Sequence, residues 1–213
     1  MRFTIPTILT LLRIILIPVF VVFYYLPVEW ANLATTAIFA SAAVTDWLDG
    51  YLARRLKAHS SFGAFLDPVA DKLMVATALV LIVDTNPTAF NGFWMALPAA
   101  IIIGREITIS ALREWMAELG ATATVAVSML GKVKTTAQMG ALLLLIYQEP
   151  LAGLPTALVG FALLYVAAAL TLWSMVMYMR SAWPVLVARE GSGLYLPELD
   201  TEALLNTMSV ALN

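Results

Sequence analysis

Long apolar stretches separated by short polar turns constrain this chain more than any other feature. A helix needs about 20 mostly apolar residues to cross the hydrocarbon core of a bilayer, which is ~30 Å thick. Six stretches approach that length: Leu9–Tyr25, Leu33–Leu56, Asp67–Val83, Phe93–Leu112, Val133–Tyr147 and Thr156–Met179. The turns between them contain proline, asparagine and glycine, which end helices. The pattern predicts an all-α integral membrane protein with six transmembrane helices.

The composition agrees with a membrane protein. Hydrophobic residues make up 62% of the 213-residue chain, and charged residues only 12%. A soluble domain is about half apolar and about a quarter charged. The absence of cysteine excludes disulfides, thiolate metal ligands and a cysteine nucleophile. The single histidine, His59, excludes a metal site built from several histidines.

Basic and acidic residues fall at opposite ends of the predicted helices. The basic end contains Arg2, Arg54, Arg55, Lys57, Arg113, Lys132, Lys134, Arg180 and Arg189. The turns at the other end contain Glu29, Asp84 and Glu149 and no lysine or arginine. Because lysine and arginine favour the cytoplasmic side of a membrane, we expect both termini in the cytoplasm. We expect a short interfacial segment before the first span, a membrane domain over residues 1–180, and a cytoplasmic tail over residues 181–213.

Four aspartates lie in or beside the second and third predicted spans, where a carboxylate costs about 2.5–3.5 kcal/mol even on lenient insertion scales. Asp46 and Asp49 are three residues apart and Asp67 and Asp71 are four apart, so each pair shares a helix face. Two antiparallel helices joined by a short turn can bring these faces together. Converging carboxylates need protonation or cations, and oxygen ligands favour hard divalent ions such as Mg²⁺, Mn²⁺ or Ca²⁺. Two such ions ~4 Å apart commonly assist displacement at phosphorus.

Small residues and one arginine accompany the four acids. Gly50 and Ala53 lie on or near the acidic face of the second span, and Gly63 lies between the two pairs. They leave room for a ligand to approach the backbone, and Arg54 suits a phosphate or diphosphate. Small residues also permit close packing of membrane helices. Each small residue alone therefore has a structural interpretation as well as a functional one.

The complete spacing D-x₂-D-G-x₂-A-R-x₈-G-x₃-D-x₃-D, from Asp46 to Asp71, resembles the signature of the CDP-alcohol phosphotransferase family. The resemblance extends to about Tyr178. It implies six spans, a polar cavity that faces the cytoplasm, and a homodimer. It further implies two divalent cations, Mg²⁺ or Mn²⁺, bound by Asp46, Asp49, Asp67 and Asp71, with Asp71 also acting as the general base.

The same resemblance implies which residues contact the CDP-lipid and its nucleotide: Gly50, Ala53, Arg54, Gly63, Thr10 and Arg13. The N-terminal segment departs from the family in part. Thr4 and Thr7 stand where asparagines are common, whereas Thr10 and Arg13 match. This chain therefore has hydroxyl rather than amide side chains at those two positions.

A second set of residues, Gly104–Ile107, Ser110–Gly120 and Gly131–Gln138, is similar to bacterial members of the family that join CDP-diacylglycerol to sn-glycerol 3-phosphate and release CMP. Glu106, Ser110 and Arg113 share one helix face. Cations beside a metal site suit a second, anionic substrate. The candidates for its phosphate group are Arg105, Arg113, Lys132 and Lys134. The same cations could instead be ordinary anchors that reach the lipid headgroups.

These patterns together predict a multi-pass transferase of the bacterial inner membrane with its active site in the cytoplasm. The acceptor hydroxyl, deprotonated by Asp71, would attack the lipid-side phosphorus of CDP-diacylglycerol, and the metals would stabilise the departing CMP. Membrane lipids are expected partners and nucleic acid is not. One alternative is a sister transferase that uses serine or inositol phosphate. Another is an ion or metal transporter, but that function predicts acids near the middle of the membrane or repeated halves.

Overall fold

The structure, a computed structural model, describes residues 5–56, 61–118, 129–151 and 153–191. These ranges contain the helices α1 Ile5–Tyr24, α2 Ala31–Leu56, α3 Ser61–Thr85, α4 Gly92–Glu118, α5 Met129–Tyr147 and α6 Thr156–Gly191. The predicted all-α class is confirmed, and each apolar stretch coincides with one helix to within a few residues. The largest difference is at α6, which continues past its predicted end at Met179 and past the expected domain boundary after residue 180.

Polar turn residues define where the helices end. Asn91 caps α4, because its side-chain oxygen accepts a hydrogen bond of 2.9 Å from the Phe93 amide. Asn86 follows α3 with a φ of 38°, in the left-handed region that asparagine tolerates. Gly153 has a φ of 82° in the turn between α5 and α6, where a side chain would be strained.

All six helices contribute to one apolar core at one end of the bundle. Its buried side chains include Phe20, Phe39, Leu79, Met95 and Leu164. Two polar pairs at this end join α1 to the end of α3: Tyr24 with Thr85, and Tyr25 with Asp84, both at 2.7 Å. We call this end, where α1 finishes and α2 begins, the closed end.

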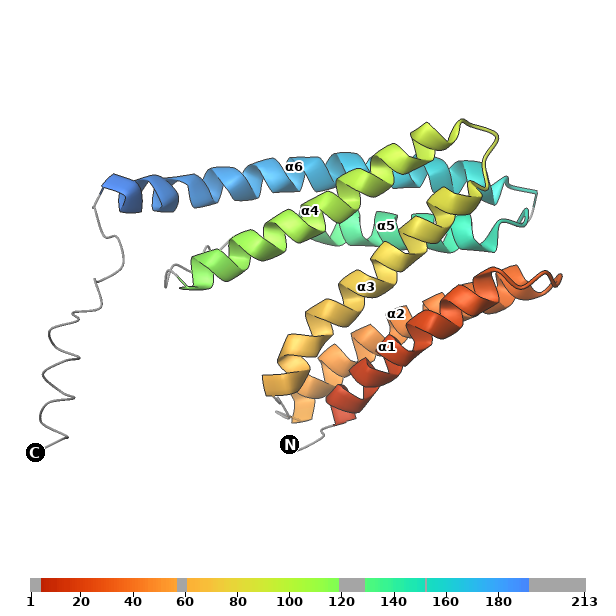
Figure 1. Cartoon of the computed structure of the whole chain (residues 1–213), viewed down its shortest axis with the longest axis horizontal. Helices are drawn as coiled ribbons and strands as arrows, with labels where there is room; N and C mark the ends of the chain where they lie inside the picture. The colour runs from red at the N-terminus through yellow and green to blue at the C-terminus, as the bar shows by residue number, and fades with distance from the viewer. Residues whose placement is uncertain (1–4, 57–60, 119–128, 152, 192–213) are drawn as a thin grey trace, which may run out of the picture.

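The helices separate at the opposite end, which we call the open end. Figure 1 shows α1, α2 and α3 diverging there from α4 and α6. A second, smaller cluster joins α4 to α6 near the open end and includes Ile109, Leu112, Met116 and Tyr178. The first three helices do not contribute to that cluster in the described part of the chain. Splaying of the two groups of helices leaves space between them.

Helices α5 and α6 approach each other closely at Gly160. A Cβ atom placed there would lie 2.9 Å from Leu145 and 3.1 Å from the Ala141 carbonyl oxygen. Small residues at such contacts are a normal means of packing membrane helices. This contact fixes α5 against α6 and so positions the polar residues at the start of α5.

Three helices of the described chain are long and apolar enough to cross a membrane, over Thr7–Tyr24, Gly92–Ala117 and Thr156–Trp183. A shorter apolar helix covers Val133–Tyr147. Helices α2 and α3 contain 26 and 25 residues, so each is roughly 38 Å long at 1.5 Å per residue. They are long enough to span the membrane but carry the charged residues of the acidic signature, and they are not among these three helices. The six-span arrangement therefore stays a prediction.

Candidate active site

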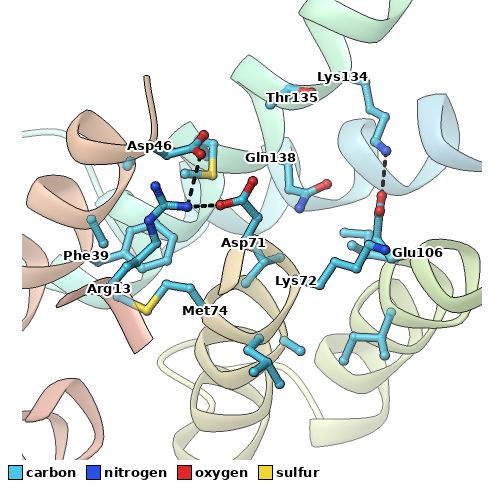
Figure 2. A pocket seen from close by; sticks show the side chains of 18 of the residues that line it. Arg13, Phe39, Asp46, Asp71, Lys72, Met74, Glu106, Lys134, Thr135 and Gln138 are labelled. Carbon is cyan, nitrogen blue, oxygen red and sulfur yellow. Dashed lines mark hydrogen bonds and ion pairs between the residues drawn. The ribbon is translucent and has the colours of Figure 1, made fainter. Parts of the chain in front are cut away.

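A pocket of about 600 Å³ lies between the diverging helices. Its walls come from α2, α3, α4 and α5, and Arg13 of α1 also contributes. Most of the lining is apolar, with Phe39, Met74 and Ile102 among its side chains. The polar lining residues are Arg13, Asp46, Asp71, Lys72, Glu106, Lys134, Thr135 and Gln138. Figure 2 shows two charged groups among them: Arg13 with Asp46 and Asp71, and Glu106 with Lys134.

The first group joins α1, α2 and α3 around the Arg13 side chain, which is only 2% exposed. One guanidinium nitrogen of Arg13 donates to Asp46 at 3.0 Å and also to Asp71. The two carboxylates are nearly half exposed, at 47% and 44%, and they face the pocket. The buried arginine thus places a positive charge between two carboxylates that line the pocket.

Thr10, one turn before Arg13 on the same face of α1, donates its hydroxyl hydrogen to Asp67. Helix α1 thus contacts three of the four signature aspartates. We call Thr10, Arg13, Asp46, Asp67 and Asp71 the acidic cluster. This cluster holds three carboxylates and one guanidinium, so acidic side chains predominate in it.

The second group lies across the pocket on α4 and α5. The Glu106 carboxylate accepts hydrogen bonds from Arg105 at 2.8 Å and from Lys134 at 3.0 Å. Arg105 also donates to the Ser174 hydroxyl of α6 at 3.4 Å. The two cations are largely buried, and Glu106 is more exposed than either. We call Arg105, Glu106 and Lys134 the basic cluster, because two cations share one carboxylate.

Arg113, which was also predicted to bind the acceptor phosphate, has different surroundings from Arg105 and Lys134. Its guanidinium carbon lies 5.6 Å from the centre of the Tyr178 ring on α6, a cation–π distance. Among the described residues that line the pocket, Arg113 does not appear. Arg113 lies on the same helix face as Glu106, as the spacing predicts, but about two turns nearer the end of α4. Lys132 belongs to α5, and its side chain lies outside the described part of the structure.

Several signature residues can be placed only by their helices. Asp49, Gly50, Ala53 and Arg54 belong to the last turns of α2, and their side chains lie outside the described part. Gly63 is buried near the start of α3, in the same helix as Asp67 and Asp71. The predicted nucleotide contacts of these residues therefore stay predictions.

Lys72, Glu106 and Gln138 also line the pocket, although the sequence motifs predicted no binding role for them. Lys72 directly follows Asp71 and lines the pocket. The spacing predicts that Glu106 shares a helix face with Ser110 and Arg113, but it does not predict the contact of Glu106 with two cations. Gln138 lies one turn after Lys134, and the recurrence of polar residues at this spacing in an apolar helix was the available signal.

The donor chemistry of the acidic cluster fits a divalent cation. Carboxylate and hydroxyl oxygens suit Mg²⁺ or Mn²⁺, and the Arg13 guanidinium already places positive charge between Asp46 and Asp71. Among the described side chains, no three acids or histidines gather closely enough to form a metal site by themselves. The fourth signature acid, Asp49, is not among those described side chains.

Comparison with known proteins identifies the family of the chain. Residues 3–173 match the CDP-alcohol phosphatidyltransferase family. The CDP-diacylglycerol–glycerol-3-phosphate 3-phosphatidyltransferase of Shigella flexneri serotype 5b (strain 8401) is 57% identical over 182 residues, which cover 85% of this chain and 96% of that protein. The protein of the same name from Escherichia coli (strain K12) is 56% identical with the same coverage. The chain belongs to the CDP-alcohol phosphatidyltransferase family, as the spacing of its aspartates predicts.

Proposed function

We propose that this protein transfers the phosphatidyl group of CDP-diacylglycerol to sn-glycerol 3-phosphate, which gives phosphatidylglycerophosphate and CMP. The observation that carries the proposal is the pocket with the acidic cluster on one wall and the basic cluster on the other. Its relatives of 56–57% identity bear the name of this activity and match over nearly their whole length.

The reaction is a displacement at phosphorus. Asp71 takes the proton of the acceptor hydroxyl, and that oxygen forms a new bond to the lipid-side phosphorus of CDP-diacylglycerol. The bond between this phosphorus and the bridging oxygen of the diphosphate breaks, and CMP departs with the electron pair. Asp71 suits the role because its carboxylate lines the pocket and is 44% exposed, within reach of an acceptor hydroxyl.

Asp46, Asp49, Asp67 and Asp71 are the residues that would hold two divalent cations. When bound, such ions neutralise the diphosphate and the departing CMP. Arg13 and Thr10 position the carboxylates from α1. This positioning role differs from the direct contact with the CDP-lipid that the family resemblance implies for both residues.

The acceptor phosphate binds at the basic cluster. Lys134 lines the pocket, and Arg105 adjoins it through Glu106. The two cations can transfer hydrogen bonds from the Glu106 carboxylate to a phosphate, whose oxygens accept charge-assisted bonds in the same way. Arg113, against Tyr178 near the end of α4, would meet the acceptor as it enters rather than at its bound position.

The polar open end would face the cytoplasm of a bacterium, with all six helices spanning the inner membrane. The length of α2 and α3 and the exposed apolar side chains of α1, α4 and α6 support the placement of these helices across a membrane. Basic residues at the open end favour the cytoplasmic side. Homodimer formation remains an expectation from the family.

One assay tests the proposed function. Purified protein in detergent or vesicles receives CDP-diacylglycerol, Mg²⁺ and one acceptor from a panel of glycerol 3-phosphate, serine, inositol and inositol phosphate, and CMP release is measured. We expect glycerol 3-phosphate to give the fastest release. Faster release with another acceptor would assign the protein to a sister activity of the family, and no release with any alcohol would contradict a transferase function.

A further inference from the structure

Gln138 of α5 is a buried polar residue that the proposed reaction does not yet use. Its side chain is 7% exposed and lines the pocket. It follows Lys134 by four residues, so both project from the same face of α5. A primary amide among apolar helices is costly unless it forms hydrogen bonds. Around the pocket, the hydrogen bonds recorded between described side chains engage the acidic and basic clusters and leave the Gln138 amide without a protein partner.

Figure 2 shows where the amide points. In that view Gln138 lies between Asp71 on one side and the Glu106–Lys134 pair on the other, with its amide directed into the pocket. The proposed function, on which this inference rests, places the attacking hydroxyl of the acceptor at Asp71 and its phosphate at Lys134. The atoms that connect those two groups in the acceptor must therefore pass along the wall formed by Gln138.

The acceptor carries one further polar group in that connection. Glycerol 3-phosphate has a secondary hydroxyl on its middle carbon, between the attacking hydroxyl and the phosphate. A primary amide can donate to a hydroxyl and accept from it. We propose that Gln138 binds this secondary hydroxyl and so selects glycerol 3-phosphate over phosphorylated alcohols that lack it.

The proposal predicts a loss that depends on the substrate. A site built to hydrogen-bond a hydroxyl rejects an analogue without it, because its polar group is then left unpaired. 3-Hydroxypropyl phosphate is the analogue that keeps the phosphate and the attacking hydroxyl and lacks only the secondary one. We expect the unmodified protein to prefer glycerol 3-phosphate by roughly tenfold in kcat/KM, the size of one hydrogen bond.

The experiment measures CMP release with both acceptors for the full chain, for Gln138→Leu and for the control Thr136→Val, an exposed residue of the same helix. Gln138→Leu keeps similar volume but no hydrogen bond. Its kcat/KM should fall roughly tenfold with glycerol 3-phosphate and little with the analogue, so the ratio of the two kcat/KM values should approach one. The KM for CDP-diacylglycerol should not change. Thr136→Val should match the unmodified protein with both acceptors.

Three results would overturn the inference. Equal kcat/KM for both acceptors in the unmodified protein would do so without any variant, and thus even if Gln138→Leu fails to fold. Equal losses on both acceptors in Gln138→Leu would assign the residue a packing role and leave the proposed function intact. An unmodified protein that uses neither phosphorylated acceptor would overturn the proposed function and this inference together.

Discussion

The two charged clusters of the pocket have opposite compositions. The acidic cluster combines one buried arginine with three aspartates, whereas the basic cluster combines one glutamate with an arginine and a lysine. Arg13 contacts Asp46 and Asp71, and Glu106 contacts both Arg105 and Lys134, so in each cluster the residue of the less common charge joins two of the opposite charge. Each cluster nevertheless keeps an excess of one sign, so the acidic cluster suits cations and the basic cluster suits an anion.

The two clusters also differ in which of their residues are exposed. In the acidic cluster Arg13 is buried, whereas Asp46 and Asp71 are nearly half exposed and line the pocket. In the basic cluster the order is reversed, because Lys134 and Arg105 are the more buried side chains and Glu106 is the more exposed one. Arg13 therefore acts as a permanent part of its cluster. Glu106 lies where an incoming phosphate can replace it.

The largest effect is expected at Asp71. Asp71→Asn removes the proton acceptor and keeps the size of the side chain, so kcat should fall by about 10²–10⁴. CDP-diacylglycerol binding should change little. Steady-state CMP release and equilibrium binding of the lipid test both statements, with Glu29→Gln at the closed end as a charge-matched control. Near-normal turnover in Asp71→Asn would reject the residue as the base.

The next largest effect is a loss of thermal stability, expected when Arg13, the only basic residue of the acidic cluster, is replaced. Breaking a buried ion pair costs about 3–5 kcal/mol, and the half-exposed aspartates reduce this to about 2 kcal/mol. Arg13→Gln should thus lower the melting temperature by about 4–8 °C, whereas Arg13→Lys should lower it less. Mg²⁺ should raise the melting temperature of Arg13→Gln more than that of the unmodified protein, because a bound cation replaces the lost charge. If Mg²⁺ raised the melting temperature of Arg13→Gln by the same amount or less, Arg13 would not be part of the cation site.

Lys134 tests the opposite cluster. A charge-assisted hydrogen bond contributes roughly 1.5–3 kcal/mol, or about ten- to a hundredfold in affinity. Lys134→Ala should raise the KM for glycerol 3-phosphate by that factor and leave the KM for CDP-diacylglycerol nearly unchanged. Arg180→Ala, an exposed cation on α6, serves as the control. Equal increases for both substrates would mean that Lys134 stabilises the fold rather than binds the acceptor.

The positions of the helices and the approach of Asp46 to Asp71 could both be predicted from the sequence. The apolar stretches gave α1 to α6 to within a few residues, except for the extension of α6 to Gly191. The spacing of the acids predicted that Asp46 and Asp71 would meet, and they share the guanidinium of Arg13. Local periodicity is enough for both results, because each depends on which face of a helix a residue occupies.

The pairing within the clusters could not be read from the sequence. Arg13 is 33 residues from Asp46 and 58 from Asp71, and Lys134 is 28 residues from Glu106. Periodicity gives the face of each residue but not the tilt and separation of the helices that carry them. The divergence of α1–α3 from α4 and α6 decides that Arg113 lies against Tyr178 while Lys134 reaches the pocket.

A smaller effect of opposite sign is expected at Glu106, the minority charge of the basic cluster. Because its carboxylate competes with phosphate for Lys134 and Arg105, Glu106→Gln should lower the KM for glycerol 3-phosphate. A partly exposed ion pair contributes up to about 1 kcal/mol, which corresponds to roughly two- to fivefold. Glu114→Gln, an exposed position on the same helix, should leave the KM unchanged. A higher KM in Glu106→Gln would show that the carboxylate orients the cations for the acceptor instead of competing with it.

The smallest effect is expected at the closed end, where a polar contact has no link to either cluster. The Tyr25 hydroxyl donates to Asp84 at 2.7 Å, and both residues are exposed. An exposed contact of this kind adds little to stability, since water can replace each partner. Tyr25→Phe should therefore leave the melting temperature, kcat and both KM values indistinguishable from those of the unmodified protein. Thermal denaturation and CMP release under the conditions used for Arg13→Gln test this directly. A loss of activity in Tyr25→Phe would mean that the closed end controls the separation of the helices at the open end, and that the two clusters do not act alone.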